Sequence, residues 1–180
     1  MRKNNSLHKK LGIFGGTFDP PHKGHYEIAT SSIKKLKLDL LIWAITKKNP
    51  LKNKPVFSLK KRTLLSKKII KNNNKIKIKS YDNIIKTNKT INLINFLKKK
   101  NKNTKLYFIM GSDNLEKLHK WHSWRKIAKL SKIVIFPRQG YKNRSLKCKA
   151  YKILKKDIII FLNSKITNIS SSKIRKNYLL

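Results

Sequence analysis

Apolar runs and segments of helical periodicity alternate along this chain, and this alternation constrains the fold more than any other feature. Apolar residues that recur every three or four positions are typical of amphipathic helices, whereas short apolar runs between them are typical of buried strands. Strands that alternate with helices predict an α/β domain, in which a parallel sheet is flanked by helices. The expected strands cover residues 11–14, 39–45, 75–80, 105–110, 132–136 and 157–162. The expected helices cover 28–36, a segment that begins at Ser58 and carries Leu64, Leu65 and Ile69, then 90–100, and 169–180.

The length of the chain fits one ordinary domain. Its 180 residues are 39% hydrophobic, which is enough to bury a core, and they include neither repeats nor a Gly/Ser linker. We therefore expect a single domain over residues 1–180, with a basic N-terminal extension at 1–10. The single cysteine, Cys148, excludes an internal disulfide, and no apolar run approaches the roughly 18 residues that span a membrane. The first residues also lack the apolar core of a secretory signal, so we expect a cytoplasmic protein without a membrane partner.

The stretch "GGTFDPPHKGH" (15–25) follows the first expected strand. Parallel α/β sheets bind ligands beyond the carboxyl ends of their strands, so a nucleotide site is expected at this loop. Gly15 and Gly16 permit a tight turn whose N–H groups can cradle phosphate, and the dipole of the next helix favours an anion. His22 and His25 are three residues apart at the start of that helix, so their imidazoles share one face, with Gly24 between them. The alternative is a proline turn with incidental histidines, which the preceding buried strand disfavours.

The formal net charge is +39, from 46 lysines and arginines against seven acidic residues. One interpretation is a nucleic-acid or anionic-membrane partner. The other is codon drift, because lysine, asparagine and isoleucine, which dominate the chain, all have AT-rich codons. The lysines are spread from end to end and arginines are few, which favours drift, and we expect no specific nucleic-acid partner. On this interpretation, an arginine or an acid that persists against the drift is a better candidate for a site.

Two separated motifs resemble those of a superfamily of nucleotidyltransferases. "GGTFDPPHKGH" resembles its HxGH signature, and "ISSSKIR" (169–175) resembles its second mark, an ISSTxIR-like stretch near the C-terminus. Within the superfamily, "FIMGSDNLEKLHKWHSWRKI" (108–127), "NPLK" (49–52) and "IVIFPRQGY" (133–141) are similar to the nicotinate-nucleotide adenylyltransferase family. The resemblance extends over nearly the whole chain, and it implies a Rossmann-like parallel sheet flanked by helices, of the nucleotidyltransferase type.

The resemblance implies a reaction that joins ATP and nicotinate mononucleotide, giving deamido-NAD and pyrophosphate. The phosphate of the mononucleotide attacks the α-phosphorus of ATP in line, and no general base is needed because this phosphate is already ionised at neutral pH. Catalysis then consists of positioning and charge stabilisation. Mg²⁺ is the expected cofactor, and it arrives with ATP rather than in a metal site of the protein.

The same resemblance assigns residues to ATP. His22 and His25 hold its phosphates and Arg175 grips the leaving β- and γ-phosphates, so these three are the expected catalytic residues. Asp113 is placed near a ribose hydroxyl, with a purely structural turn acid as the alternative. The expected ATP-binding residues are Gly15, Gly16, Thr17, Phe18, Gly24, Gly111, Asp113, Ile169, Ser170, Ser171 and Ser172.

On the acceptor side, the resemblance makes Trp121 a stacking plate for the pyridine ring and Thr90 a donor to the nicotinate carboxylate. Core packing is the alternative for Trp121, because Trp124 lies at helical spacing from it. Lys52 either attracts the mononucleotide phosphate or is a solvated loop residue, and Arg138 is similarly open. The expected acceptor-binding residues are Thr90, Trp121, Lys52 and Asn49.

Two other functions are weighed against this one. Another HxGH transferase, such as a phosphopantetheine or glycerol-phosphate nucleotidyltransferase, shares both motifs, but the segment around Trp121 argues against it. A basic nucleic-acid-binding module leaves the pair of motifs unexplained. The sequence makes no prediction of the oligomeric state.

Overall fold

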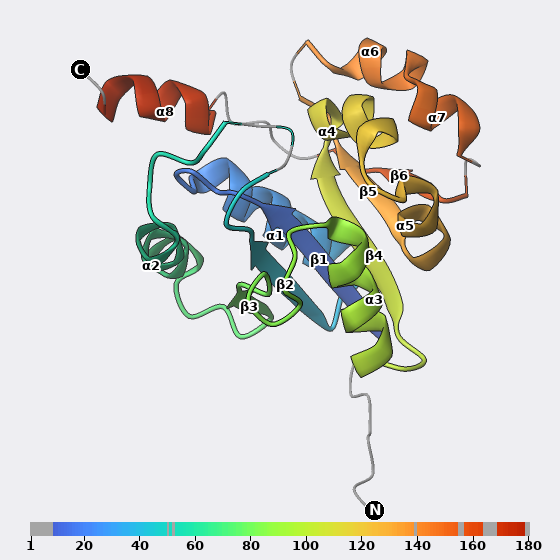
Figure 1. Ribbon diagram of the computed structural model, residues 1–180, viewed down its shortest axis with the longest axis horizontal. Helices are drawn as coiled ribbons and strands as arrows, with labels where there is room; N and C mark the ends of the chain where they lie inside the picture. The colour runs from blue at the N-terminus through green and yellow to red at the C-terminus, as the bar shows by residue number, and fades with distance from the viewer. Residues whose placement is uncertain are drawn as a thin grey trace, which may run out of the picture.

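A six-stranded parallel sheet runs through the residues that the computed structural model describes, which are 9–49, 51, 53–138, 140–154, 157–163 and 169–178 (Figure 1). The strands are β1 (Lys10–Gly16), β2 (Leu40–Ile45), β3 (Ile76–Lys79), β4 (Lys105–Gly111), β5 (Lys132–Phe136) and β6 (Ile159–Phe161). The helices are α1 (Lys23–Leu36), α2 (Leu59–Ile70), α3 (Thr90–Lys100), α4 (Ser112–Lys117), η1 (Leu118–Lys120), α5 (Trp124–Leu130), α6 (Lys142–Lys147), α7 (Lys149–Ile153) and α8 (Ser171–Tyr178). Each expected strand is present, and the predicted parallel α/β fold is confirmed.

The direction in which the chain adds strands changes at β1. The spatial order is β3-β2-β1-β4-β5-β6, so β2 and β3 extend the sheet on one side of β1 and β4 to β6 extend it on the other. The loops that leave β1 and β4 therefore diverge and open a crevice at their carboxyl ends, the usual ligand site of such sheets. Gly15 and Gly16 do not form the expected tight turn, because they pair with β2 as the last residues of β1. Residues 17–22 connect β1 to α1 and Gly111 ends β4, so the two expected nucleotide segments meet at this crevice.

Helices cover both faces of the sheet. One core cluster joins strand residues such as Phe108 to apolar residues of α3, α4, α5 and α7. The other joins Phe14 and Trp43 to Ala29 of α1 and Ile70 of α2. Figure 1 shows α1 behind the sheet and α3 in front of it. The strands read as almost continuous apolar runs because side chains on both of their faces are buried.

Two predicted helix starts are confirmed. Ser58 caps α2, because its Oγ accepts a hydrogen bond from the backbone N–H of Lys61 (3.2 Å). Helix α3 begins at Thr90. Helix α1 begins at Lys23, directly after His22, so the two histidines lie at the start of the helix and the apolar positions from Ile28 onward follow later in it. Of the expected basic extension, Lys10 already belongs to β1, and residues 1–8 lie outside the described residues.

The buried face of α2 differs from the prediction. The expected apolar residues were Leu64, Leu65 and Ile69, but Leu64 is 54% exposed and the buried residues of α2 are Arg62, Ser66 and Ile70. The helix turns Arg62 inward because its guanidinium binds backbone carbonyls of neighbouring loops. Polar bonding of one side chain has thus overridden the apolar periodicity.

Candidate active site

His22 and His25 lie together at the start of α1. The backbone N–H of His22 donates to Nδ1 of His25 (3.2 Å), and the two ring centroids are 3.8 Å apart. Both side chains are buried. Because Nδ1 of His25 accepts this hydrogen bond, the proton of the neutral ring resides on Nε2, which makes Nε2 a donor. Gly24 separates the two histidines within the first turn of the helix.

His22 is held in its neutral form. Its pKa is lowered from 6.5 to about 4, first because burial disfavours the charged imidazolium and second because the positive charge of Arg138 lies nearby. Over the described part of the chain, neither ring nitrogen of His22 has a hydrogen-bond partner. The ring nitrogens of His22 are therefore available to a ligand. A bound anion would offset the positive charge of Arg138, which lowers the pKa of His22.

Close packing explains the second glycine of the loop. A Cβ atom on Gly16 would lie 3.2 Å from the ring of Phe18, tighter than ordinary van der Waals contact. Phe18 has a left-handed φ of 50°, and its buried ring packs on Trp43 with centroids 4.7 Å apart. Only the backbone of Phe18 can therefore face a nucleotide. The carbonyl of Thr17, beside it, accepts a hydrogen bond from Arg62 (2.6 Å).

An acid from the start of α4 and an arginine from the loop after β5 meet at the same crevice. Nη1 of Arg138 lies 3.4 Å from Oδ2 of Asp113, and the backbone N–H of Arg138 donates to Oγ of Ser112 (2.8 Å). A Cβ atom on Gly111 would lie 2.5 Å from Oδ1 of Asp113, so a side chain there would force this carboxylate to shift. Oδ1 is buried and has no partner among the described residues. The structure thus pairs Asp113 with Arg138 and leaves one carboxylate oxygen for a further donor.

Helix α8 brings the C-terminal motif onto the histidine loop. Oγ of Ser171 donates to the carbonyl of Pro20 (2.9 Å), and Nη1 of Arg175 donates to the carbonyl of Asp19 (2.5 Å). Nη2 of Arg175 also donates to Oγ of Ser172 (3.2 Å). Two other residues of the motif lie at its start: Ser170, whose Oγ accepts from the backbone N–H of Lys173 (3.2 Å), and the exposed Ile169.

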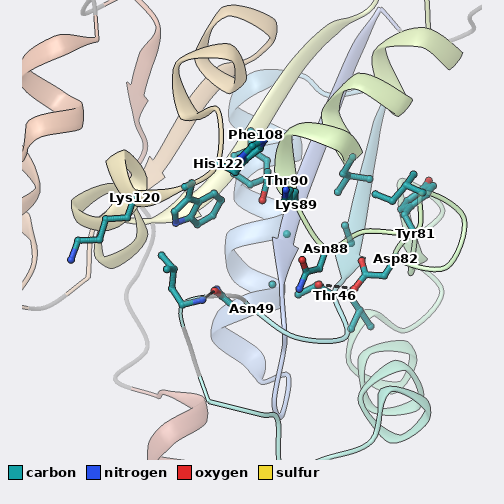
Figure 2. Close-up of a pocket in the computed structure, with 18 residues that line it drawn as sticks. Thr46, Asn49, Tyr81, Asp82, Asn88, Lys89, Thr90, Phe108, Lys120 and His122 are labelled. Carbon is teal, nitrogen blue, oxygen red and sulfur yellow. Dashed lines mark hydrogen bonds between the residues drawn. The ribbon is translucent and has the colours of Figure 1, made fainter.

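A cavity of about 310 Å³ opens beside the carboxyl end of β1, and Figure 2 draws its lining. It contains the predicted acceptor residues Asn49, Thr90 and Trp121 together with Gly15 and Gly16. Lys52 lies outside the described residues. The further lining residues are Ala44, Ile45, Thr46, Leu51, Tyr81, Asp82, Ile85, Asn88, Lys89, Leu93, Phe108, Lys120 and His122.

Trp121 and Trp124 have different surroundings. Trp124 is buried in the core at the start of α5, whereas Trp121 is half-buried and lines the cavity. The indole of Trp121 meets the ring of Phe108 edge-on, with centroids 6.0 Å apart. This contact orients the indole while part of it stays open to the cavity.

The start of α3 faces the same cavity. The first hydrogen bonds of the helix run from the N–H groups of Asn92 and Leu93 to the carbonyl of Lys89, so the N–H groups of Thr90 and Ile91 precede the helical ladder. Figure 2 draws Lys89 and Thr90 among the side chains that line the cavity. A helix start with a hydroxyl offers several donors to an anionic group.

Asp82 and Arg62 were not predicted as part of the site. Oδ2 of Asp82 accepts hydrogen bonds from Oγ1 of Thr46 (2.8 Å) and from the backbone N–H of Lys47 (2.7 Å), the first of which is drawn in Figure 2. Burial also raises the pKa of the neighbouring Tyr81. The composition could have indicated both residues as site candidates, because Asp82 is one of few acids and Arg62 is one of few arginines in a lysine-rich chain.

The described residues include neither a cluster of metal ligands nor a membrane-spanning helix. No group of three or more His, Cys, Asp and Glu side chains is placed to hold a metal ion there. No helix in that part of the chain is long and apolar enough to cross a membrane.

Comparisons with known proteins point to one family. The family model described as cytidylyltransferase-like matches residues 13–177. A Pelagibacter ubique (strain HTCC1062) protein named "Probable nicotinate-nucleotide adenylyltransferase" is 51% identical, over 98% of this chain and 99% of its own. A protein of the same name from Clostridium novyi (strain NT) is 37% identical, over 93% and 86%.

Solved structures share the fold. The Plasmodium falciparum nicotinic acid mononucleotide adenylyltransferase complexed with NaAD superposes with a TM-score of 0.73 at 23% identity, over 94% of this chain and 83% of that chain. The structure of the same enzyme complexed with APC superposes with a TM-score of 0.72 over the same shares.

Proposed function

Because the chain belongs to the nicotinate-nucleotide adenylyltransferase family, we propose that it transfers the adenylyl group of ATP to nicotinate mononucleotide, giving deamido-NAD and pyrophosphate. One observation carries this proposal at the level of residues. Gly15 and Gly16, the last two residues of β1, line the cavity that contains Trp121 and Thr90, and the loop after them leads to the His22 and His25 pair. An acceptor in the cavity and a nucleotide at the histidines would therefore meet at these glycines.

The step is an in-line displacement at phosphorus. A phosphate oxygen of the mononucleotide forms a bond to the α-phosphorus of ATP, and the bond from that phosphorus to the bridging oxygen breaks. The electron pair leaves with pyrophosphate. The attacking phosphate is already an anion, so the chain has only to align the two groups and to stabilise the charge that develops on the leaving group.

The ATP side is assigned to both motifs. Nε2 of His25 donates to a phosphate oxygen of ATP. Neutral His22 binds the ATP phosphates beside the positive charge of Arg138. Arg175 releases the carbonyl of Asp19 and binds the leaving phosphates instead. Its planar guanidinium can donate two hydrogen bonds to phosphate oxygens at once. The hydroxyls of Ser170 and Ser172 and the start of α8 would add donors to the same oxygens, and Ser171 would exchange its present contact with the carbonyl of Pro20 for them. Asp113 would accept from a ribose hydroxyl through Oδ1, which supports the predicted role.

The acceptor side is assigned to the cavity. The indole of Trp121 stacks on the pyridine ring, and the N–H and hydroxyl of Thr90 donate to its carboxylate. Asn49 would bind the mononucleotide through its amide nitrogen, because its Oδ1 already accepts from the backbone N–H of Leu51 (2.9 Å). A role for Lys52 in holding the phosphate is still a prediction from the sequence alone.

Mg²⁺ belongs to the substrate in this scheme, since it binds ATP phosphates and keeps much of its water. The net charge of +39 would attract both anionic substrates without requiring a nucleic-acid partner. A cytoplasmic location and the absence of specific nucleic-acid binding also stay predictions. The oligomeric state is open.

One assay tests the reaction. Purified protein is mixed with ATP, Mg²⁺ and one acceptor at a time, and pyrophosphate release is measured. The acceptors are nicotinate mononucleotide, nicotinamide mononucleotide, phosphopantetheine and glycerol 3-phosphate. Turnover should be fastest with nicotinate mononucleotide and should yield deamido-NAD. Faster turnover with phosphopantetheine or glycerol 3-phosphate would replace this function with that of another HxGH transferase.

A further inference from the structure

Arg62 binds four backbone carbonyls with one buried guanidinium. The residue is 2% exposed and lies in the first turn of α2. Its Nε donates to the carbonyl of Phe57 (2.9 Å), its Nη1 to those of Thr17 (2.6 Å) and Thr46 (2.8 Å), and its Nη2 to that of Lys47 (3.2 Å). It does not line the substrate cavity.

These carbonyls belong to the two loops that serve the two substrates. Thr17 directly follows β1 and leads toward His22. Thr46 and Lys47 directly follow β2 and lead to Asn49, on the wall of the cavity. One guanidinium therefore fixes the end of β1 to the end of β2, on the side where ATP and the acceptor would meet.

Two buried or half-buried acids complete the arrangement from the other side. Asp19 accepts from the backbone N–H groups of Val56 (2.9 Å) and Phe57 (2.8 Å), and Asp82 accepts from that of Lys47 (2.7 Å). Burial lowers the pKa of Arg62, whereas the charges of Asp19 and Asp82 raise it. The two carboxylates thus bind N–H groups of the segment between β2 and α2, while Arg62 binds carbonyls of both loops.

Only arginine can make this set of contacts. Its guanidinium carries five N–H donors in a rigid planar fork and has no acceptor, which suits several carbonyls at fixed positions. A lysine ammonium is a compact charge with three donors and cannot reach carbonyls on opposite sides at once. The chain is otherwise dominated by lysine, and it retains arginine here.

We propose that Arg62 is a positioning residue that sets the separation of the ATP loop and the acceptor loop, and so aligns the attacking phosphate with the α-phosphorus. Arg62 touches neither substrate and acts through the backbone of Thr17, Thr46 and Lys47. In-line displacement is sensitive to such alignment, because a shift of about 1 Å can cost on the order of 10²-fold in rate. This inference rests on the proposed adenylyl transfer.

The test compares Arg62→Lys with two other variants. Each is first examined by circular dichroism and a thermal melt, and kinetics are then measured well below its melting temperature, with ATP and nicotinate mononucleotide varied separately. We expect Arg62→Lys to lower kcat/KM for both substrates by about tenfold or more. Asp82→Asn, which disturbs only the Thr46–Lys47 side, should lower kcat/KM mainly for the acceptor. Arg144→Lys is the matched control, because Arg144 is an exposed arginine that pairs with Glu116 on the surface (2.7 Å).

The outcomes separate the two hypotheses. A lower kcat/KM for both ATP and nicotinate mononucleotide in folded Arg62→Lys, with unchanged values in Arg144→Lys, supports the positioning role. Wild-type kinetics in folded Arg62→Lys, or a loss for one substrate alone, overturns it while the proposed function stands. If Arg62→Lys does not fold, Arg62→Gln takes its place under the same criteria. If neither folds, Arg62 serves the fold as a whole and the positioning role is overturned. A wild type that releases no pyrophosphate with any acceptor refutes the proposed function itself.

Discussion

Nη1 of Arg175 donates a hydrogen bond to the backbone carbonyl of Asp19 at 2.5 Å, across 156 residues of sequence. The same nitrogen lies 3.7 Å from the Asp19 carboxylate, and Ser171 binds the adjacent carbonyl of Pro20 (2.9 Å). Helix α8 is thereby attached to the loop that precedes His22. In Figure 1, α8 lies at the upper left, apart from the helices that cover the sheet. Its hydrogen bonds to Pro20 and Asp19 agree with a role at the candidate site.

Replacing His22 by alanine should lower turnover by about 10²-fold or more, which is the scale for losing one preorganised charge-stabilising donor. The fold should survive, because the imidazole nitrogens of His22 have no hydrogen-bond partner among the described residues. Steady-state pyrophosphate release measures the effect. Lys23→Ala, an exposed neighbour in the same turn, is the control and should behave as wild type. Near-wild-type turnover in folded His22→Ala would remove His22 from the catalytic set.

The free energy of unfolding should depend on pH through His22. Its pKa is about 4 in the folded chain and 6.5 in the reference state, so between these values the unfolded chain binds more protons. The stability that neutral His22 contributes is therefore complete above pH 6.5 and is lost as the pH falls toward 4. The loss at the low end of this window is on the order of 2 to 3 kcal/mol.

Urea unfolding at pH 7 and pH 4.5 checks this prediction, with wild type compared with His22→Gln. The difference between the two proteins isolates His22 from the other titrating groups. Wild type should lose more stability than the variant on acidification. An equal loss in both would mean that His22 is not held neutral by its burial.

Arg175→Lys should reduce turnover clearly although the charge is kept. A planar guanidinium can hold two phosphate oxygens at once, whereas an ammonium is a single point of charge. The measurement is kcat and the KM for ATP. Lys173→Arg changes an exposed basic residue of the same helix and should leave both values unaltered. Full activity in Arg175→Lys would mean that Arg175 contributes only its positive charge and not the geometry of its guanidinium.

Trp121 should determine how well either acceptor is used, and Thr90 should determine which acceptor is preferred. We expect wild type to prefer nicotinate over nicotinamide mononucleotide by about tenfold or more in kcat/KM, because a carboxylate accepts from both donors of Thr90 and an amide does not. Trp121→Ala should weaken both acceptors together, since both rings present the same face to the indole. Thr90→Val should reduce the preference while the KM for ATP stays near its wild-type value.

The acceptor prediction is checked by measuring kcat/KM for both mononucleotides in the three proteins. Equal use of the two acceptors by wild type would contradict it. So would a change of selectivity in Trp121→Ala without one in Thr90→Val, because the two residues would then have exchanged roles.

Much of the fold and part of the site could be predicted from local sequence. The apolar runs predicted every strand, because strands of a parallel sheet are buried on both faces and leave a continuous apolar signal. The helical spacing predicted α3 with Thr90 at its start, and Thr90, Asn49 and Trp121 do line one cavity. These features depend on residue type and short-range spacing, which the sequence displays directly.

Only the tertiary structure decided how the loops at the carboxyl edge are held together. The partners of Arg62 are backbone carbonyls between 5 and 45 residues away. Every residue has a backbone carbonyl, so the sequence does not indicate which of them Arg62 binds. The pairing of Asp113 with Arg138 and the inward rotation of α2 have the same origin, because each depends on distances between segments that meet only in the folded chain. Local sequence therefore determined which elements form and which residue types carry the chemistry, while three-dimensional contact decided which arginine is buried, which histidine is kept neutral and how the two motifs meet.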